Sequence, residues 1–301
     1  MTRPALSPGA SDRPREPAAK RPGGFLAGKV VQLTAFYLFL TAMAFVFLVP
    51  YIFTVFAAFK PIGKIFSEPA WDPPSSLYLH NFAHDFSAAG FLRYLGNTFL
   101  VTVVLTIGQV VFSILGAYAF ARLRFPGRDR IFWLYLLTLM VPNAVTIIPL
   151  YAIMREAHLL NTYYAIFLPY VFGAPYTIFL MRQFFRNIPQ EVIDAARVDG
   201  CSERRILLRI IVPLSKPVII TATLIAFVFG WNNFLWPLIV TNSQSLYVLT
   251  TGLANFQSNM SASAEVNYAL AGSVITLFPM ALLFAIFQRH IIRSISITQI
   301  R

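Results

Sequence analysis

Cysteine is almost missing from this chain of 301 residues, since Cys201 stands alone. A single cysteine excludes an internal disulfide and any metal site built from several cysteines. The four histidines are scattered, and His80 and His84, which could share one helix face, have no convincing third ligand. We therefore expect no metal ion, and we interpret these two histidines as polar residues of a loop.

Charge is also scarce, because Asp, Glu, Lys and Arg make up only 12% of the residues. The hydrophobic share is 57% and the mean hydropathy is +0.65, whereas soluble domains contain about 45–50% apolar residues with glycine counted. This composition predicts a membrane protein. The net charge of +12 does not indicate a nucleic-acid partner, because the basic residues lie between apolar stretches rather than along one surface stripe.

Six apolar stretches are each long enough to cross the hydrocarbon layer, for which a helix needs about 20 residues. They cover residues 30–59, 98–121, 131–153, 163–181, 218–240 and 266–287. The sequence therefore predicts an all-α membrane protein with six transmembrane helices over residues 30–301. Residues 1–29 are predicted to be a disordered basic tail, because they are rich in proline and poor in large apolar side chains.

These six stretches contain no Asp, Glu, Lys, Arg or His. Ion-coupled carriers and proton pumps usually need ionisable groups at membrane depth, so their absence disfavours a secondary carrier. The sequence also has no glycine-rich phosphate-binding loop with its lysine. If this protein moves a solute, we expect its energy to enter from outside the bilayer and the chain to have no catalytic residues of its own.

The distribution of arginine and lysine predicts the orientation, because positive charge accumulates in short cytoplasmic loops. Residues 1–29, 122–130, 182–216 and 289–301 hold nearly all of the basic residues. The opposite side holds only Lys60, Lys64, Arg93 and Arg155. Both termini are therefore predicted to be cytoplasmic.

The stretch of residues 187–217 is the only long polar segment between apolar spans, and we call it the 187–217 hairpin. Asn187 is a candidate cap for a first helix, and Pro189 suits its first turn. Gly200 supplies the positive φ that ends this helix. A second helix is predicted to begin at Ser202 and to stop near Pro213 and Pro217.

Two motifs carry a family resemblance. Asp194-Ala195-Ala196, followed by Asp199-Gly200 and then by Ile210-x-Val212-Pro213, resembles the EAA loop of permease subunits of ATP-binding cassette importers. Trp231-Asn232-Asn233-Phe234-Leu235-Trp236-Pro237 resembles the tryptophan-asparagine motif of the sugar-importing subfamily. The chain is therefore similar to MalG-like permeases of binding-protein-dependent sugar importers over roughly residues 95–293, and the likeness implies their type I fold.

The resemblance implies that the 187–217 hairpin docks on a cytoplasmic ATPase. The ATPase-coupling residues are then Glu191, Asp194, Ala195, Ala196, Asp199, Gly200, Cys201, Arg204 and Pro213. It also implies a multi-pass subunit of a bacterial cytoplasmic membrane that works with a second, MalF-like permease subunit, two ATPase subunits, an extracytoplasmic binding protein and membrane lipid. ATP and Mg belong to the partners, and this chain binds no cofactor. The expected cargo is an oligosaccharide or a related polyol.

The sequence departs from the family pattern at three places. Asp194 stands where glutamate is usual, and Cys201 replaces a usual alanine. Residues 294–301 contain no glycine, although MalG-like chains often end in a glycine-rich tail that reaches the ATPases. The resemblance therefore does not extend to a contact of this tail.

Helix-breaking residues mark the later spans as the surroundings of a path, because broken backbone at membrane depth needs protein or a wet cavity around it. They are Pro142, Pro149, Pro169, Pro175, Gly230, Pro237 and Pro279. The candidate lining residues are Asn143, Tyr170, Tyr176, Trp231, Asn232, Asn233 and Asn267. Amides bind hydroxyl groups, and aromatic rings stack on sugars. Alternatively, such residues bond neighbouring helices or lie in the interfacial belt.

Residues 241–265 are predicted to form a long polar loop. By the resemblance this loop faces the binding protein, with contacts from Asn255, Gln257, Ser258 and Asn259, and a plain connector is the alternative.

An alternative for the whole chain is a membrane enzyme that uses Asp194 and Asp199 at its cytoplasmic face, although five residues is a poor spacing for shared acid-base work. Purification distinguishes these readings, because a permease brings an ATPase and a second membrane subunit.

Overall fold

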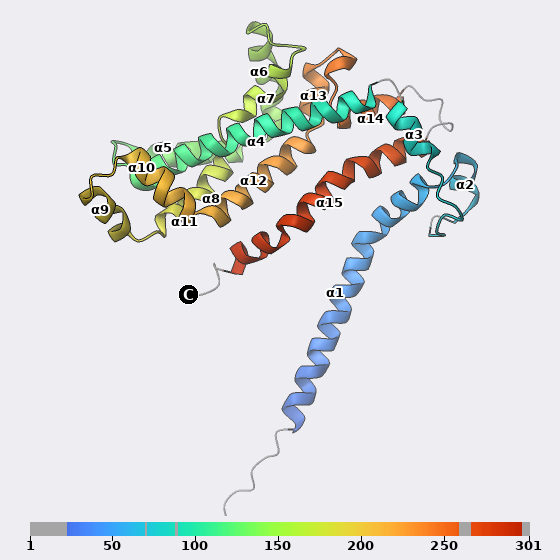
Figure 1. Ribbon diagram of the computed structural model, residues 1–301, viewed down its shortest axis with the longest axis horizontal. Coiled ribbons are helices and arrows are strands. Elements are labelled where there is room, and N and C mark those ends of the chain that lie inside the picture. The colour runs from blue at the N-terminus through green and yellow to red at the C-terminus, as the bar shows by residue number, and fades with distance from the viewer. Residues whose placement is uncertain (1–22, 70, 88–89, 259–265, 297–301) are drawn as a thin grey trace, which may run out of the picture. The chain divides into compact units, whose positions relative to one another are not determined.

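The computed structural model describes residues 23–69, 71–87, 90–258 and 266–296. Every regular element within these ranges is a helix, as Figure 1 shows, which confirms the all-α prediction. The chain divides into two compact units, residues 1–52 and residues 53–301. We describe each unit by itself.

Helix α1 (Gly23–Ala58) provides the first unit and ends in the second. Its residues Lys29–Ala58 are long and apolar enough to cross a membrane, in agreement with the predicted first span. The helix begins at Gly23, inside the segment that was assigned from the sequence to the tail. The rest of that tail lies outside the described residues.

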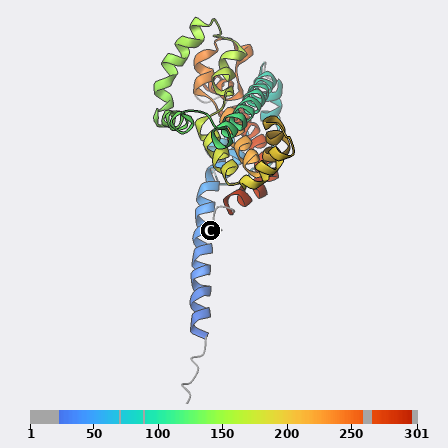
Figure 2. The same ribbon diagram turned by 90° about the vertical axis from the view of Figure 1, so that its left-hand side faces the viewer.

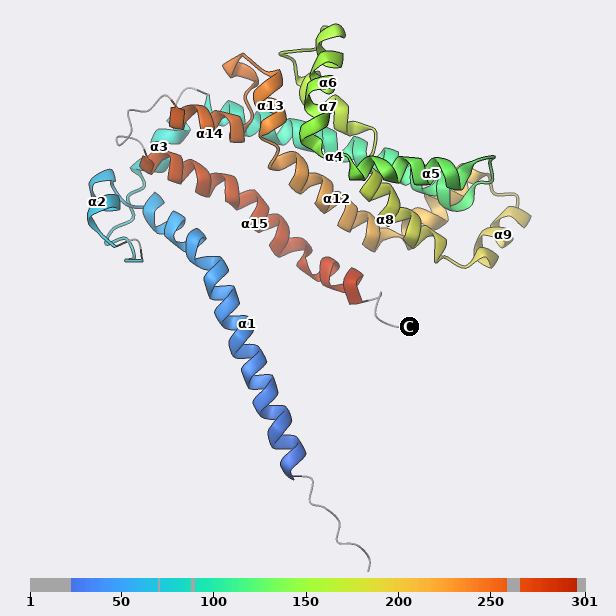
Figure 3. The same cartoon turned by 180° about the vertical axis from the view of Figure 1, so that it is seen from behind.

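Three helices form the centre of the second unit. They are α4 (Phe91–Arg122), α8 (Pro175–Arg186) and α12 (Lys216–Trp231), and α4 packs against both of the others (Figures 1 and 3). Ala117, Met181 and Ala222, one from each helix, are fully buried in one apolar cluster. Small side chains let membrane helices approach closely. Helix α15 (Val266–Ser296) packs against α12 from another side.

The predicted third span is sharply bent. It consists of α5 (Arg128–Leu137), the short turn η1 (Thr138–Met140) and α6 (Asn143–Glu156). The parts meet at 103°, a corner that can be followed in Figure 2. Pro142 has an extended backbone just before α6, which confirms the break predicted there.

The fourth predicted span is divided between α7 (Tyr163–Val171) and α8. Gly173 has φ +94° and Pro175 begins α8. Both features suit a break, since glycine accepts positive φ and proline fits the first helical turn.

The predicted fifth span is divided between α12 and α13 (Leu235–Val240). Four of the expected breakers do not interrupt a helix, because Pro149, Pro169, Gly230 and Pro279 lie inside α6, α7, α12 and α15. Pro237 lies in the first turn of α13, where no intrahelical donor is missing. Among the described residues, four helices are long and apolar enough to be spans, or six if each bent pair counts as one.

The predicted loop of residues 241–265 was wrong in part, because it contains η3 (Gln244–Leu246) and α14 (Leu249–Ser258). Leu249 and Thr251 are fully buried, and α14 packs against α4 and α15. The Asn97 side-chain amide donates to the carbonyl groups of Ser245 and Tyr247 at 2.8 and 2.9 Å. These contacts stabilise a segment whose sequence alone is polar.

Helices α2 (Ile62–Ser67) and α3 (His80–Ser87) lie between the first two spans. Helix α3 contains His80 and His84, which were interpreted from the sequence as residues of a loop. It packs against α15, where the Asn267 side-chain amide donates to Asn81 Oδ1 at 2.7 Å. Asn81 in turn donates to the carbonyl groups of Ala58 and Lys60 at 2.8 and 3.0 Å.

Asp85 of α3 gives this contact a predicted pH dependence. It is only 4% exposed, and burial raises the pKa of its carboxyl group to about 7. His84 Nδ1 lies 3.9 Å from Asp85 Oδ1. Because the folded protein holds the proton more tightly than the unfolded chain, the stability from this group is complete below about pH 4. It is lost as the pH rises towards 7.

We therefore expect Asp85→Asn to stabilise the protein at pH 8, where the wild-type carboxyl group is charged. The expected gain is about 2 kcal/mol, roughly half of what three pKa units give, since water reaches this outer helix. Thermal unfolding in detergent between pH 4 and 8 measures it. Asp199→Asn, at an exposed position, is the control. An equal pH dependence in Asp85→Asn and wild type contradicts the prediction.

Candidate functional site

The first helix of the 187–217 hairpin is α9 (Gln190–Val198), which Pro189 precedes. The prediction that Asn187 caps it was wrong. Asn187 instead follows the last residue of α8, and its backbone N–H donates to the carbonyl group of Phe184. The connection is only three residues long, so Asn187 still belongs to the end of the preceding helix.

Gly200 ends α9 as predicted. Its φ is +76°, its N–H donates to the carbonyl group of Arg197, and the N–H of Cys201 donates to the carbonyl group of Ala196. This pair of bonds is the Schellman motif that closes many helices. A Cβ added at Gly200 would have no atom within 4 Å. Backbone conformation, rather than lack of space, therefore requires glycine here.

The second helix follows Ser202 as predicted and is not uniform. It consists of α10 (Glu203–Ile206), a π-helical turn η2 (Leu207–Ile211) and α11 (Val212–Leu214). It passes Pro213 and stops at Ser215, and the following α12 leaves at 83°. The predicted stop near Pro213 and Pro217 is confirmed to within two residues.

One face of the hairpin is part of the protein core. Ile193 of α9 and Ile206 and Ile211 of the second helix are fully buried. They belong to one apolar cluster with Ala117 of α4 and Phe185 of α8. The hairpin is therefore packed onto the membrane-spanning helices rather than suspended as a loop.

Arg122, at the end of α4, binds the base of the hairpin. Its guanidinium donates to Gln190 Oε1 at 2.8 Å and also to the carbonyl groups of Phe185 and Ile188. A planar guanidinium can hold several acceptors in fixed directions. The end of α4, the end of α8 and the start of α9 are thereby joined by one side chain.

A second set of polar contacts crosses the hairpin. The Tyr118 hydroxyl of α4 donates to Glu203, and Arg197 Nη2 lies 2.9 Å from the other carboxylate oxygen of Glu203. Arg197 also lies 3.3 Å from Asp194 Oδ1. The hydrogen bond to Glu203 raises the pKa of Arg197. Because these groups are exposed, each ion pair contributes at most about 1 kcal/mol.

The predicted coupling residues divide into two groups. Glu191, Ala195, Asp199, Gly200, Arg204 and Pro213 are exposed. Ala196 is buried and Cys201 is half-buried against the apolar cluster. Asp194 is exposed and paired within the hairpin, whereas Glu191 and Asp199 make no ion pair with any residue that the structure describes. These two carboxylates are the ones available to a basic partner.

Sequence reasoning missed the residues that attach the hairpin. Tyr118 and Arg122 precede their partners by more than 60 residues, and no local pattern signals such a contact. Arg197 and Glu203 face each other across the turn at a spacing outside helical periodicity. In the sequence, only the cluster of basic residues near Arg122 stood out, and it was interpreted as evidence for the orientation in the membrane.

The predicted lining residues do not form one surface. Trp231 is buried and its ring N–H donates to the carbonyl group of Thr276 at 3.2 Å. Asn267 is buried against α3. Both therefore hold helices together in this structure.

The remaining candidates lie near the helix breaks. Asn143 begins α6, Tyr176 lies in the first turn of α8, and both are exposed. Tyr170 of α7 makes edge contacts with the rings of Phe229 and Trp236, at centroid distances of 5.1 and 6.4 Å. Asn232 and Asn233 lie in the gap between α12 and α13, where Asn232 is exposed and Asn233 is half-buried.

The predicted contacts for a binding protein fall at the end of α14. Asn255 is half-buried within this helix. Gln257 and Ser258 form its last residues, and their side chains lie outside the described part. Asn259 also lies outside the described residues.

Comparison with known proteins identifies relatives over most of the chain. Residues 109–297 match the family model "Binding-protein-dependent transport system inner membrane component". The arabinooligosaccharides transport system permease protein AraQ of Halalkalibacterium halodurans is 35% identical over 85% of this chain and 91% of its own length. The sn-glycerol-3-phosphate transport system permease protein UgpE of Yersinia pestis is 34% identical over 77% of this chain and 85% of its own.

A solved structure has the same fold. It belongs to a bacterial ABC transporter involved in the import of the acidic polysaccharide alginate. The TM-score is 0.76 at 22% identity, over 91% of this chain and 99% of that chain. A further match, with TM-score 0.60 and 14% identity over 87% of this chain and 96% of the other, comes from a bacterial alginate ABC transporter in complex with an alginate pentasaccharide-bound periplasmic protein.

Proposed function

Because this chain belongs to the family of binding-protein-dependent transport system inner membrane components, we propose that it is a permease subunit of a carbohydrate importer. It is a transport subunit rather than an enzyme. ATP and Mg bind to two partner ATPase subunits, and a second, MalF-like permease subunit completes the path. The 187–217 hairpin receives the movement of an ATPase.

The two-sided construction of the hairpin is the observation that supports this proposal most directly. Its apolar face is buried against α4, α8 and α12, and Arg122 ties its base to α4 and α8. Its opposite face exposes Glu191 and Asp199 without ion pairs to described residues. A partner that pulls on such a hairpin moves the spanning helices with it, because packed contacts shift as units.

The relatives support a saccharide or polyol as cargo. One is named for arabinooligosaccharides, another for sn-glycerol-3-phosphate, and the solved structure for alginate. These compounds share closely spaced hydroxyl groups. An extracytoplasmic binding protein delivers the cargo in this proposal, with Asn255, Gln257, Ser258 and Asn259 as its contacts. The periplasmic protein bound to the alginate transporter in the second solved structure supports such a partner.

The proposed setting is a bacterial cytoplasmic membrane that residues 30–301 cross repeatedly as one permease domain. Both termini lie on the cytoplasmic side, a placement that rests on the basic residues between spans. The path runs past Tyr170, Tyr176 and the gap at Asn232 and Asn233. Asn143 lies at the corner between α5 and α6 and is included for its exposed amide.

Replacing Gly200 tests the hairpin's role. Gly200→Val forces a β-branched residue into positive φ, which costs about 1–2 kcal/mol and loosens the turn without a clash. In the assembled importer we expect uptake to fall about tenfold, while membrane insertion is kept. Gly200→Asn is the matched control, since asparagine tolerates this conformation. Normal uptake by the valine variant would count against the coupling role, and co-purification of an ATPase tests the assembly separately.

A further inference from the structure

The turn between α4 and α5 contains more arginines than those that contact the 187–217 hairpin. We call residues 122–130 the arginine turn, and it contains Arg122, Arg124, Arg128 and Arg130. Gly127, with φ +77°, reverses the chain just before α5. Four guanidinium groups are thereby gathered at the end of one spanning helix and the start of the next.

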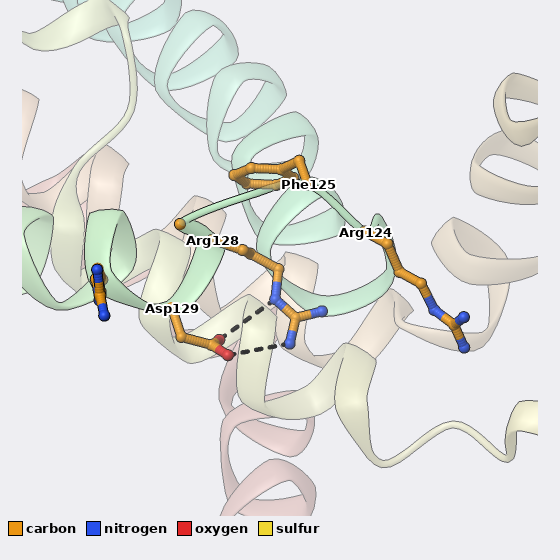
Figure 4. Close-up of a pocket in the computed structure, with 6 residues that line it drawn as sticks. Arg124, Phe125, Arg128 and Asp129 are labelled. Carbon is orange, nitrogen blue, oxygen red and sulfur yellow. Dashed lines mark hydrogen bonds and ion pairs between the residues drawn. The ribbon is translucent and has the colours of Figure 1, made fainter.

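Two hollows open on this turn. The first has a volume of about 470 Å³ and is the one drawn in Figure 4. Its lining consists of Arg124, Phe125, Gly127, Arg128, Asp129 and Arg130. The second, of about 490 Å³, lies between the turn and the 187–217 hairpin. Arg124 and Arg128 line both, so the two hollows adjoin.

The acidic groups of these hollows are already occupied. Asp129 accepts from Arg128 at 3.2 Å and from Arg182 at 3.0 Å. Glu203, in the second hollow, is engaged with Arg197 and Tyr118. Arg182 is buried. Because Asp129 already pairs with Arg128 and Arg182, its negative charge does not neutralise the exposed arginines at the rim of the hollow.

Three arginines of the turn have no carboxylate partner among the described residues. Arg122 donates only to carbonyl and amide oxygens. Arg124 and Arg130 are exposed and make no ion pair with a described residue. In Figure 4 the Arg124 side chain points away from the pair of Arg128 and Asp129. Free guanidinium groups beside a hollow are suited to a phosphate, which they bind through paired hydrogen bonds.

The surface that continues from the hollows is apolar. Ile131, Trp133 and Leu134 follow within two turns of α5, and the Trp133 and Leu134 side chains are each 65% exposed. Exposed apolar residues on a membrane-spanning segment face acyl chains, and tryptophan prefers the headgroup level. A phosphate in the hollow would thus lie beside the exposed apolar surface of α5.

From this arrangement we propose that the arginine turn is a binding site for the phosphodiester headgroup of an anionic phospholipid. The headgroup lies against Arg124 and Arg130, and the acyl chains lie along the exposed face of α5. A soluble phosphate compound would use the arginines but leave that face uncovered. Basic pockets at the ends of spanning helices are known to hold such headgroups. The site stands whether or not the hairpin couples to an ATPase.

The experiment uses the full-length purified protein in detergent, with lipid retention measured by native mass spectrometry. The probes are phosphatidylglycerol, zwitterionic phosphatidylcholine and inorganic phosphate. We expect phosphatidylglycerol to be retained over phosphatidylcholine, and Arg124→Gln with Arg130→Gln to lower this retention about tenfold. Neither arginine bonds to a described residue, so the double variant is expected to fold.

Arg205→Gln with Arg209→Gln is the matched control, since it removes the same charge from exposed positions that line neither hollow. Lipid retention by this control variant equal to that of the wild type supports a defined site. An equal loss of lipid retention in both double variants indicates general electrostatic attraction and overturns the proposal. Full competition by inorganic phosphate overturns the lipid assignment. Normal lipid retention together with lost ATPase binding in Arg124→Gln with Arg130→Gln also overturns the lipid assignment, because the turn would then be a protein interface.

Discussion

Replacing Gly108 by leucine is expected to destabilise the second unit strongly. Gly108 lies in α4 where this helix crosses α7, and a Cβ at this position would lie 2.5 Å from Cγ1 of Val171. The Cβ and the carbonyl oxygen of Val171 would each be 3.3 Å away. Rotating the valine side chain cannot relieve all three contacts, so the two helices must separate.

The expected loss is about 3 kcal/mol or more, because overpacking alone costs about 1–3 kcal/mol and backbone displacement adds to it. Thermal unfolding and size-exclusion chromatography in detergent measure the effect. Gly96→Leu is the control in the same helix, since a Cβ there has no atom within 4 Å. A Gly108→Leu variant as stable as Gly96→Leu would show that the contact between α4 and α7 is not tight.

The second large effect is expected at Arg122. Arg122→Gln removes the guanidinium that joins Gln190 to the carbonyl groups of Phe185 and Ile188. Hydrogen bonds from a charged group are worth about 1.5–3 kcal/mol. Losing them should raise the population of an undocked hairpin about tenfold or more.

Cys201 reports this change without knowledge of the cargo, because it is the chain's one cysteine and is half-buried in the hairpin cluster. We expect a thiol reagent to label Cys201 about tenfold faster in Arg122→Gln, since local opening exposes it. Arg122→Lys keeps the charge but lacks the planar fork, so its labelling rate should lie between wild type and glutamine. Unchanged labelling in the glutamine variant would separate Arg122 from the docking of the hairpin.

Local chemistry made several features of the fold predictable. Pro142, Pro175 and Gly200 mark real ends of helices, because proline just before or within a first turn and glycine at positive φ act through their own backbone. Apolar stretches of sufficient length identified the spans. The same rule over-predicted breaks at Pro149 and Pro169, since a membrane helix can continue past proline when its neighbours satisfy the backbone.

Contacts between residues distant in sequence determine the features of the fold and of the hairpin that the sequence did not predict. Helix α14 was predicted as a loop because residues 241–265 are rich in Asn, Ser and Gln, yet this helix packs against α4 and α15. In the hairpin, the resemblance identified the segment, but Asp194 could not be known to pair with its own helix. The attachment through Tyr118 and Arg122 joins residues distant in sequence, and it became visible only in the folded chain.

Helix α4 has a mechanical consequence that follows from its length. Its 32 residues extend for about 48 Å without a proline. At one end Asn97 grips the carbonyl groups of Ser245 and Tyr247, and at the other Arg122 grips the hairpin. Because a helix without a proline is stiff along its axis, a tilt imposed at Arg122 is transmitted to the contacts of Asn97 with the segment before α14.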